Sequence, residues 1–67
     1  MVIMTVKTKE FLQKHKLDIP EDLKHLNNLL DILDDMMLNS LGSEYEPTEA
    51  TRDIERVYDD LFYSNFE

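Results

Sequence analysis

The middle of the chain carries a regular pattern of apolar side chains. Between residues 23 and 41, apolar residues recur at spacings of three and four, and polar residues fill the positions between them. The repeat consists of Leu23, Leu26, Leu30, Leu33 and Met37, widened on one side by Leu29 and Met36. Because these positions share one face of an α-helix, the pattern predicts an amphipathic helix with an apolar stripe of roughly 140°. Ile32 and Leu38 lie just beyond its edges and should be partly exposed.

The ends of this helix are predicted from the few residues that interrupt helices. The chain has one glycine and two prolines. Asp18 and Glu21 can form a reciprocal cap around Pro20, which is tolerated in a first helical turn. Gly42 can supply the left-handed residue that often terminates a helix. We therefore expect the helix to span about 19–41.

A second apolar repeat follows in the segment "PTEATRDIERVYDDLFYSNF". Ala50, Ile54, Val57 and Leu61 are spaced by four, three and four, which predicts a helix over about 48–64. The connection of about six residues makes the two helices antiparallel neighbours. The segment "TVKTKEFLQKHK" predicts a weaker helix over about 5–16, with Phe11 and Leu12 as its apolar anchors. The expected fold is all-α: a helical hairpin with a shorter N-terminal helix, in a single domain formed by residues 1–67.

A chain of 67 residues without cysteine has few means of stabilising a small core. Such domains are marginal alone and commonly depend on disulfides, metals or association. The absence of cysteine excludes disulfides and thiolate metal sites and fits a reducing compartment. A two-helix hairpin cannot enclose a stripe of roughly 140°. Part of it should therefore face a second copy or a partner.

The net charge of −8 is unevenly distributed along the chain. Residues 1–17 contain four lysines and one glutamate, a balance of +3, whereas residues 18–67 contain fourteen acids and three basic residues, a balance of −11. A surface this negative repels phosphate, so direct nucleic-acid binding is not expected. The charge predicts a basic protein partner, although it is equally typical of a protein that is merely kept soluble.

The sequence offers no constellation for catalysis. The serines lie near expected helix ends without a glycine-rich turn, and no glycine-rich loop is present to hold a phosphate. His15 and His25 are ten residues apart and do not form a ligand pair, and the aspartates on a regular helix face lack the turning backbone of a calcium loop. We expect no enzymatic activity, cofactor or metal. No apolar run approaches the roughly 20 residues of a membrane span, so the expected location is the cytoplasm.

Two groups of side chains remain as candidate partner-binding sites. Carboxylates one helical turn apart lie about 5–6 Å from each other, comparable with neighbouring phosphates of a nucleic-acid strand. The acidic candidates are Asp31, Asp34 and Asp35 on the middle helix and Glu49, Asp53 and Asp60 on the last helix. The aromatic candidates are Phe62, Tyr63 and Phe66, which lie beyond the core stripe, with Tyr63 pointing to the opposite side of the helix.

Together these features predict a small acidic protein–protein interaction module. The leading hypothesis is a stoichiometric inhibitor or regulator, of the kind found in phages and mobile elements, that blocks a basic nucleic-acid-handling protein by imitating nucleic acid. One alternative is a homodimeric four-helix bundle that serves as a scaffold or adaptor. Another is an antitoxin-like subunit that completes its folding on a cognate protein.

Overall fold

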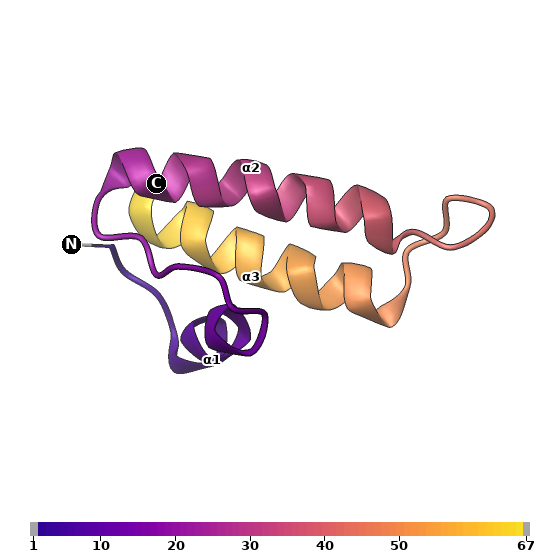
Figure 1. Cartoon of the computed structure of the whole chain (residues 1–67), viewed down its shortest axis with the longest axis horizontal. Helices are drawn as coiled ribbons and strands as arrows, with labels where there is room; N and C mark the ends of the chain where they lie inside the picture. Colours follow the sequence, from indigo (N-terminus) through magenta and orange to yellow (C-terminus); the bar gives the residue numbers. More distant parts are fainter. Residues whose placement is uncertain (1, 67) are drawn as a thin grey trace.

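The structure, a computed structural model, describes residues 2–66, and in this part of the chain all regular secondary structure is helical. Helix α1 spans Val6–Lys14, α2 spans Leu23–Ser40 and α3 spans Glu49–Phe66. Figure 1 shows α2 and α3 side by side and antiparallel along the long axis of the molecule, with α1 seen almost end-on below them. The predicted hairpin with a shorter N-terminal helix is confirmed.

The core lies where the three helices meet. Its buried apolar side chains are Leu12 from α1, Leu26, Leu29, Leu30 and Leu33 from α2, and Ile54, Val57 and Leu61 from α3. Both predicted apolar repeats are shorter in the structure than expected, because Leu23 on α2 is 48% exposed and Ala50 on α3 is also exposed. Each of these two residues lies in the first turn of its helix, at an end of the hairpin, where the neighbouring helix offers little cover. Thr51 is buried at the start of α3 in place of Ala50.

The predicted start of α2 at about residue 19 is wrong. Asp22 caps the helix, and its side chain accepts a hydrogen bond from the backbone N–H of His25 at 2.8 Å. The cause is Pro20, because a residue that precedes proline is disfavoured in the helical region, so that Ile19 cannot belong to the first turn. The segment between α1 and α2 instead crosses the hairpin in a non-helical conformation and buries Pro20.

The end of α2 also differs from the prediction. Gly42 does not have a positive φ. The helix ends because Leu41 is extended, with φ −65° and ψ 146°. The left-handed residue of the connection is Tyr45, with φ 60°, inside a turn closed by a hydrogen bond from its N–H to the carbonyl oxygen of Gly42 at 2.9 Å.

Hydroxyl groups join the end of α2 to the start of α3. Thr48 donates to the backbone carbonyl of Ser40 at 2.8 Å, and the Ser40 hydroxyl lies 2.6 Å from that of Thr51. The Thr48 hydroxyl also accepts from the backbone N–H of Thr51, which caps α3. These bonds fix the register of the hairpin at its closed end.

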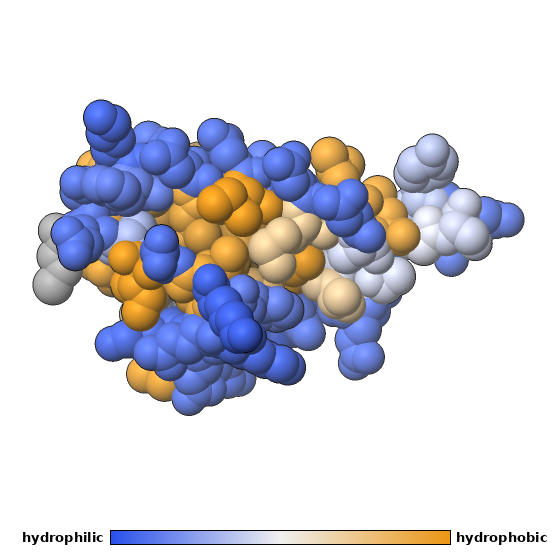
Figure 2. Space-filling view, viewed as in Figure 1, coloured by the Kyte–Doolittle hydropathy of each residue, from blue (hydrophilic) through white to orange (hydrophobic). Residues whose placement is uncertain are grey.

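The face seen in Figure 2 shows a band of hydrophobic residues between polar rows on α2 and on α1. Helix α1 is only nine residues long, half the length of either partner, and it covers only part of this face. Ile32 and Leu38 are exposed, as predicted, and Met36 is half-buried. None of the helices within residues 2–66 has the length and apolar character needed to cross a bilayer.

Candidate functional site: an aromatic and acidic face

A row of aromatic side chains runs along one side of α3. Tyr58, Phe62 and Phe66 occupy every fourth position, so they lie on successive turns of the helix. The ring centroids are 6.3 Å apart between Tyr58 and Phe62 and 5.6 Å apart between Phe62 and Phe66, and Tyr63 packs edge-on against Phe62 at 5.5 Å. Tyr58 is half-buried, whereas Phe62 and Phe66 are each 40% exposed. The row is therefore a continuous aromatic surface open to solvent.

Carboxylates from both hairpin helices border this row. Asp31 and Asp34 project from α2 and Asp59 from α3, and all three are exposed. Partial burial raises the pKa of the Tyr58 phenol, and the negative charges of Asp34, Asp31 and Asp59 raise it further. The three carboxylates are therefore close enough to act on one hydroxyl group. We call the following residues the aromatic–acidic face: Asp31, Asp34, Tyr58, Asp59, Phe62, Tyr63 and Phe66.

The aromatic–acidic face lies on the side of α3 that faces away from α1. Thr5 and Thr8, at the start of α1, donate hydrogen bonds to the carboxylate of Asp60. Phe62 follows Asp60 by two positions and thus lies about 160° from it around the helix axis. Helix α1 therefore leaves the row of Tyr58, Phe62 and Phe66 uncovered.

Asp60 has a structural role in the attachment of α1. One carboxylate oxygen accepts from the Thr5 N–H at 3.0 Å, the Thr5 hydroxyl at 3.2 Å and the Thr8 hydroxyl at 2.6 Å. The other oxygen lies 3.5 Å from the Ser64 hydroxyl. Partial burial raises the pKa of Asp60, but these hydrogen bonds outweigh it and hold the pKa below its usual value. A carboxylate committed in this way is less available to a partner.

A second contact ties the N-terminal segment to the end of α3. The Asn65 amide accepts from the Ile3 N–H and donates to the Ile3 carbonyl oxygen, both at 2.8 Å, in the manner of a strand pair. The same amide donates to the Leu61 carbonyl oxygen at 2.7 Å. The segment before α1 is thus held at the C-terminal end of the hairpin.

The predicted acidic row of α3 lies on the α1 side of the helix. Asp53 lies 3.9 Å from the Arg56 guanidinium and lines a groove of about 340 Å³ between α1 and α3. Glu49 is exposed in the first turn of α3, where its negative charge stabilises the helix by interacting with the positive end of the helix dipole. Asp35 is exposed about 100° beyond Asp34 on α2.

The structure thus places the predicted partner-binding residues in two groups, with Asp35 apart from both. Asp31 and Asp34 lie near Tyr58, at one end of the aromatic row that continues through Phe62 and Phe66, with Tyr63 packed against Phe62. Glu49, Asp53 and Asp60 lie on the other side of α3. Two members of the face, Tyr58 and Asp59, were not among the predicted site residues. Tyr58 could have been predicted from its spacing of four from Phe62. It was missed because Tyr58 also lies next to the apolar core positions of the same helix. The position of Asp59 opposite the aspartates of α2 follows only from the packing of the hairpin.

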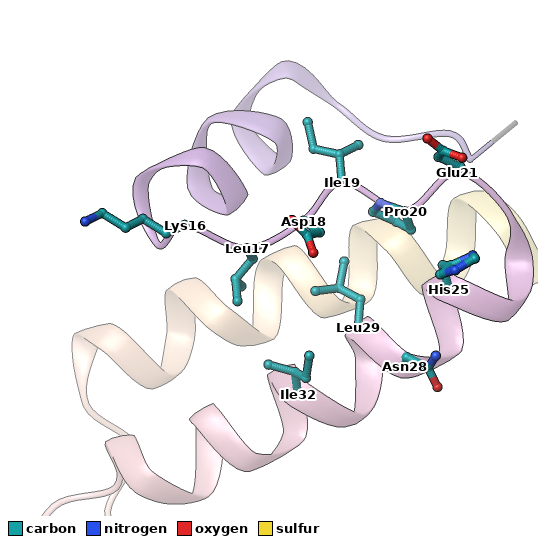
Figure 3. A pocket seen from close by; sticks show the side chains of 10 residues that line it. All are labelled: Lys16, Leu17, Asp18, Ile19, Pro20, Glu21, His25, Asn28, Leu29 and Ile32. Carbon is teal, nitrogen blue, oxygen red and sulfur yellow. The ribbon is translucent and has the colours of Figure 1, made fainter.

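A groove of about 610 Å³ lies between α2 and the segment that leads into it. In Figure 3, Leu17, Leu29 and Ile32 point into this space, while Lys16 points away from it. His25, at one end, lies with its Nδ1 atom 2.7 Å from the carboxylate of Asp22. This contact completes the cap of α2, and the hydrogen bonds from His25 lower the pKa of Asp22. Within residues 2–66, no group of three or more histidine, aspartate or glutamate side chains is arranged to hold a metal ion.

The comparisons with known proteins return no relative. No protein-family model, no curated protein and no solved structure matches this chain. The function proposed below is therefore inferred from the geometry of the aromatic–acidic face.

Proposed function

We propose that this chain is a small acidic interaction module that binds a basic protein and acts as a stoichiometric inhibitor or regulator of it. The observation that supports this proposal is the aromatic–acidic face, in which a row of aromatic side chains ends in exposed phenylalanines and has carboxylates from two helices near its tyrosine. Large aromatic side chains are the usual anchors of protein interfaces. Carboxylates beside them favour a positively charged surface and accelerate the encounter with it.

We further propose that the target handles nucleic acid and that the chain acts in the cytoplasm. Residues 18–67 carry fourteen acidic and three basic side chains. Their potential attracts surfaces that evolved to hold phosphate. Carboxylates on successive helical turns repeat at about 5–6 Å, close to the spacing of phosphates along a strand. The absence of cysteine fits a reducing compartment.

A homodimeric scaffold is the second candidate function. Ile32 and Leu38 are exposed on the long helix α2, and Leu38 is 69% exposed. Because they lie at opposite edges of the apolar stripe, pairing of two hairpins along one edge would bury one of them in a four-helix bundle. The molecular mass in solution distinguishes this candidate, because a monomer excludes the bundle.

The proposed function is tested by affinity capture on three versions of the full chain. One is the natural chain, one carries Asp31→Asn with Asp34→Asn, and a matched control carries Glu44→Gln with Glu46→Gln in the connection between α2 and α3. We expect a basic protein to be retained by the natural chain and the control and lost with the first variant. DNA or RNA should release it, and retention should weaken above about 0.15 M salt, where the screening length is near 8 Å.

Two outcomes would contradict the proposal. One is a set of retained proteins that is identical for all three versions, because the face would then have no part in binding. The other is retention that neither nucleic acid nor salt between 0.05 and 0.5 M affects, because a target that handles nucleic acid must compete for the same surface.

A further inference from the structure

The hairpin already carries one short amphipathic helix, and the contacts of this helix show how α3 holds a helix against one of its sides. Helix α1 and its flanks contain Lys7, Lys9, Lys14 and Lys16, all exposed. Its inward face presents Thr8 and Leu12, which are buried, and the half-buried Phe11. At the start of the helix, the carboxylate of Asp60 accepts hydrogen bonds from the Thr5 N–H and the Thr8 hydroxyl. This short amphipathic helix is thus bound to α3 by apolar anchors and by a carboxylate that accepts hydrogen bonds from two threonines, and none of its lysines forms an ion pair within residues 2–66.

The aromatic–acidic face repeats these features on the opposite side of α3. Tyr58, Phe62 and Phe66 provide apolar contact along residues 58–66, a length of about 12 Å for the eight steps of 1.5 Å between the first and the last. Anchors at positions i, i+4 and i+7 of a partner helix span about 10.5 Å, which matches this row. Leu23 precedes Asp34 by eleven residues and so lies within about 20° of it on α2. It therefore extends the apolar surface next to the last turn of α3.

The carboxylates of the aromatic–acidic face lack cationic partners within residues 2–66. The two ion pairs found in this part of the chain are His25 with Asp22 and Arg56 with Asp53, and neither involves Asp31, Asp34 or Asp59. A symmetric dimer through this face would bring the three unpaired carboxylates of each copy into one shared interface. A basic partner neutralises these carboxylates, whereas a second copy of the chain adds further carboxylates that repel them.

We infer that the aromatic–acidic face binds a basic amphipathic α-helix of a partner protein, with the apolar side of that helix on Tyr58, Phe62 and Phe66 and its lysines or arginines beside Asp31, Asp34 and Asp59. This inference rests on the proposed function for the identity of the partner as a basic protein. It adds the structural element that is recognised. Arginine also gains from the exposed aromatic rings, which attract cations.

The inference is tested with three synthetic peptides of about 18 residues, long enough to form a helix on binding. The first has leucines at helical spacing with arginines and lysines elsewhere, the second has the same composition in an order without an apolar stripe, and the third replaces the basic residues with glutamate. Binding to the full chain is measured by fluorescence anisotropy at about 0.1 M salt. We expect the first peptide to bind at least tenfold more tightly than the second and the third not to bind.

Variants of the chain locate the contact. Phe62→Ala with Phe66→Ala should weaken the first peptide about thirtyfold, as expected for the loss of interface anchors. Asp31→Asn with Asp34→Asn should weaken it several-fold, whereas the control Glu44→Gln with Glu46→Gln should have little effect. Amide chemical shifts should change at Tyr58, Phe62 and Phe66 and remain unchanged at Thr8 and Phe11 of α1. Circular dichroism checks that each variant retains its helices.

Several results would overturn the inference. Equal binding of the first and second peptides would show attraction by charge alone. Unchanged binding by the phenylalanine variant, or shift changes confined to α1, would place the contact elsewhere. A natural chain that is a dimer, and becomes monomeric in the phenylalanine variant, would assign the face to a second copy. If the peptides fail but captured proteins still depend on Asp31 and Asp34, only the helix inference falls. If the first peptide binds as expected but no captured protein responds to nucleic acid, only the proposed function falls.

Discussion

Asp60 should control whether α1 stays attached to the hairpin. Its carboxylate accepts the 2.6 Å hydrogen bond of the Thr8 hydroxyl, and Thr8 is only 2% exposed. Replacement by alanine removes this acceptor and that of the Thr5 N–H. Hydrogen bonds to a charged group contribute about 1.5–3 kcal/mol each, and partial exposure of Asp60 reduces this figure. We expect Asp60→Ala to lower the free energy of unfolding by about 2 kcal/mol, a large fraction of the stability of a domain this small.

The isosteric change Asp60→Asn isolates the contribution of the charge. It retains an acceptor oxygen, so its expected cost at neutral pH is about 1 kcal/mol. Because the hydrogen bonds lower the pKa of Asp60 in the folded state, the folded protein binds this proton less readily than the unfolded chain. The stabilisation is therefore complete above the unfolded pKa of about 3.9 and is lost as the pH falls through the lower folded value.

The assay is urea unfolding followed by circular dichroism at several pH values between about 7 and 2.5. The difference in stability between the natural chain and Asp60→Asn should shrink toward zero at the acidic end, because a protonated Asp60 is as uncharged as asparagine, while the effects of the other carboxylates are the same in both proteins. Asp53→Asn is the matched control, since Asp53 is exposed on the same helix and lies 3.9 Å from its nearest cation. Hydrogen exchange should become faster in α1 before it changes in α2 or α3. Equal effects of the two substitutions, or a difference that does not change with pH, would refute this reasoning.

Three further comparisons test the fold. Leu30→Ala should lower the free energy of unfolding by about 2–4 kcal/mol, measured by urea unfolding, because Leu30 is buried in the core. Leu38→Ala, at an exposed position, should lower it by less than about 0.5 kcal/mol. Similar values for the two variants would mean that the hairpin register is wrong. In the absence of a partner, Phe62→Ala with Phe66→Ala should preserve helix content and lower the free energy of unfolding by about 1 kcal/mol or less for each residue. A larger loss of stability would assign these rings to the fold. Gly42→Ala should leave the stability unchanged or raise it slightly, because Gly42 has no positive φ. An added Cβ atom would lie 3.5 Å from its nearest neighbour, the Glu46 carbonyl oxygen. A marked fall in melting temperature would contradict this prediction.

The helices and the main core could be read from the order of apolar residues. Leu26, Leu30 and Leu33 are buried as their spacing requires, because a regular helix places them on one face wherever a neighbour covers it. The short helix was likewise readable from Phe11 and Leu12. The start of α2 could not be read in the same way, since Asp18 and Asp22 are both good N-cap residues. Pro20, which is buried in the segment between α1 and α2, favours the cap at Asp22 over the cap at Asp18.

The composition of the candidate site depended on tertiary packing. The sequence grouped Asp60 with Glu49 and Asp53 by helical spacing, but the position of α1 determines that Asp60 binds Thr5 and Thr8. The sequence likewise placed the aromatics and the aspartates of α2 on separate helices. The antiparallel packing of the hairpin brings Asp31 and Asp34 to Tyr58. Periodicity specifies which side chains share a face of one helix, whereas the contacts between helices depend on side-chain packing and hydrogen bonds that link residues up to 62 positions apart.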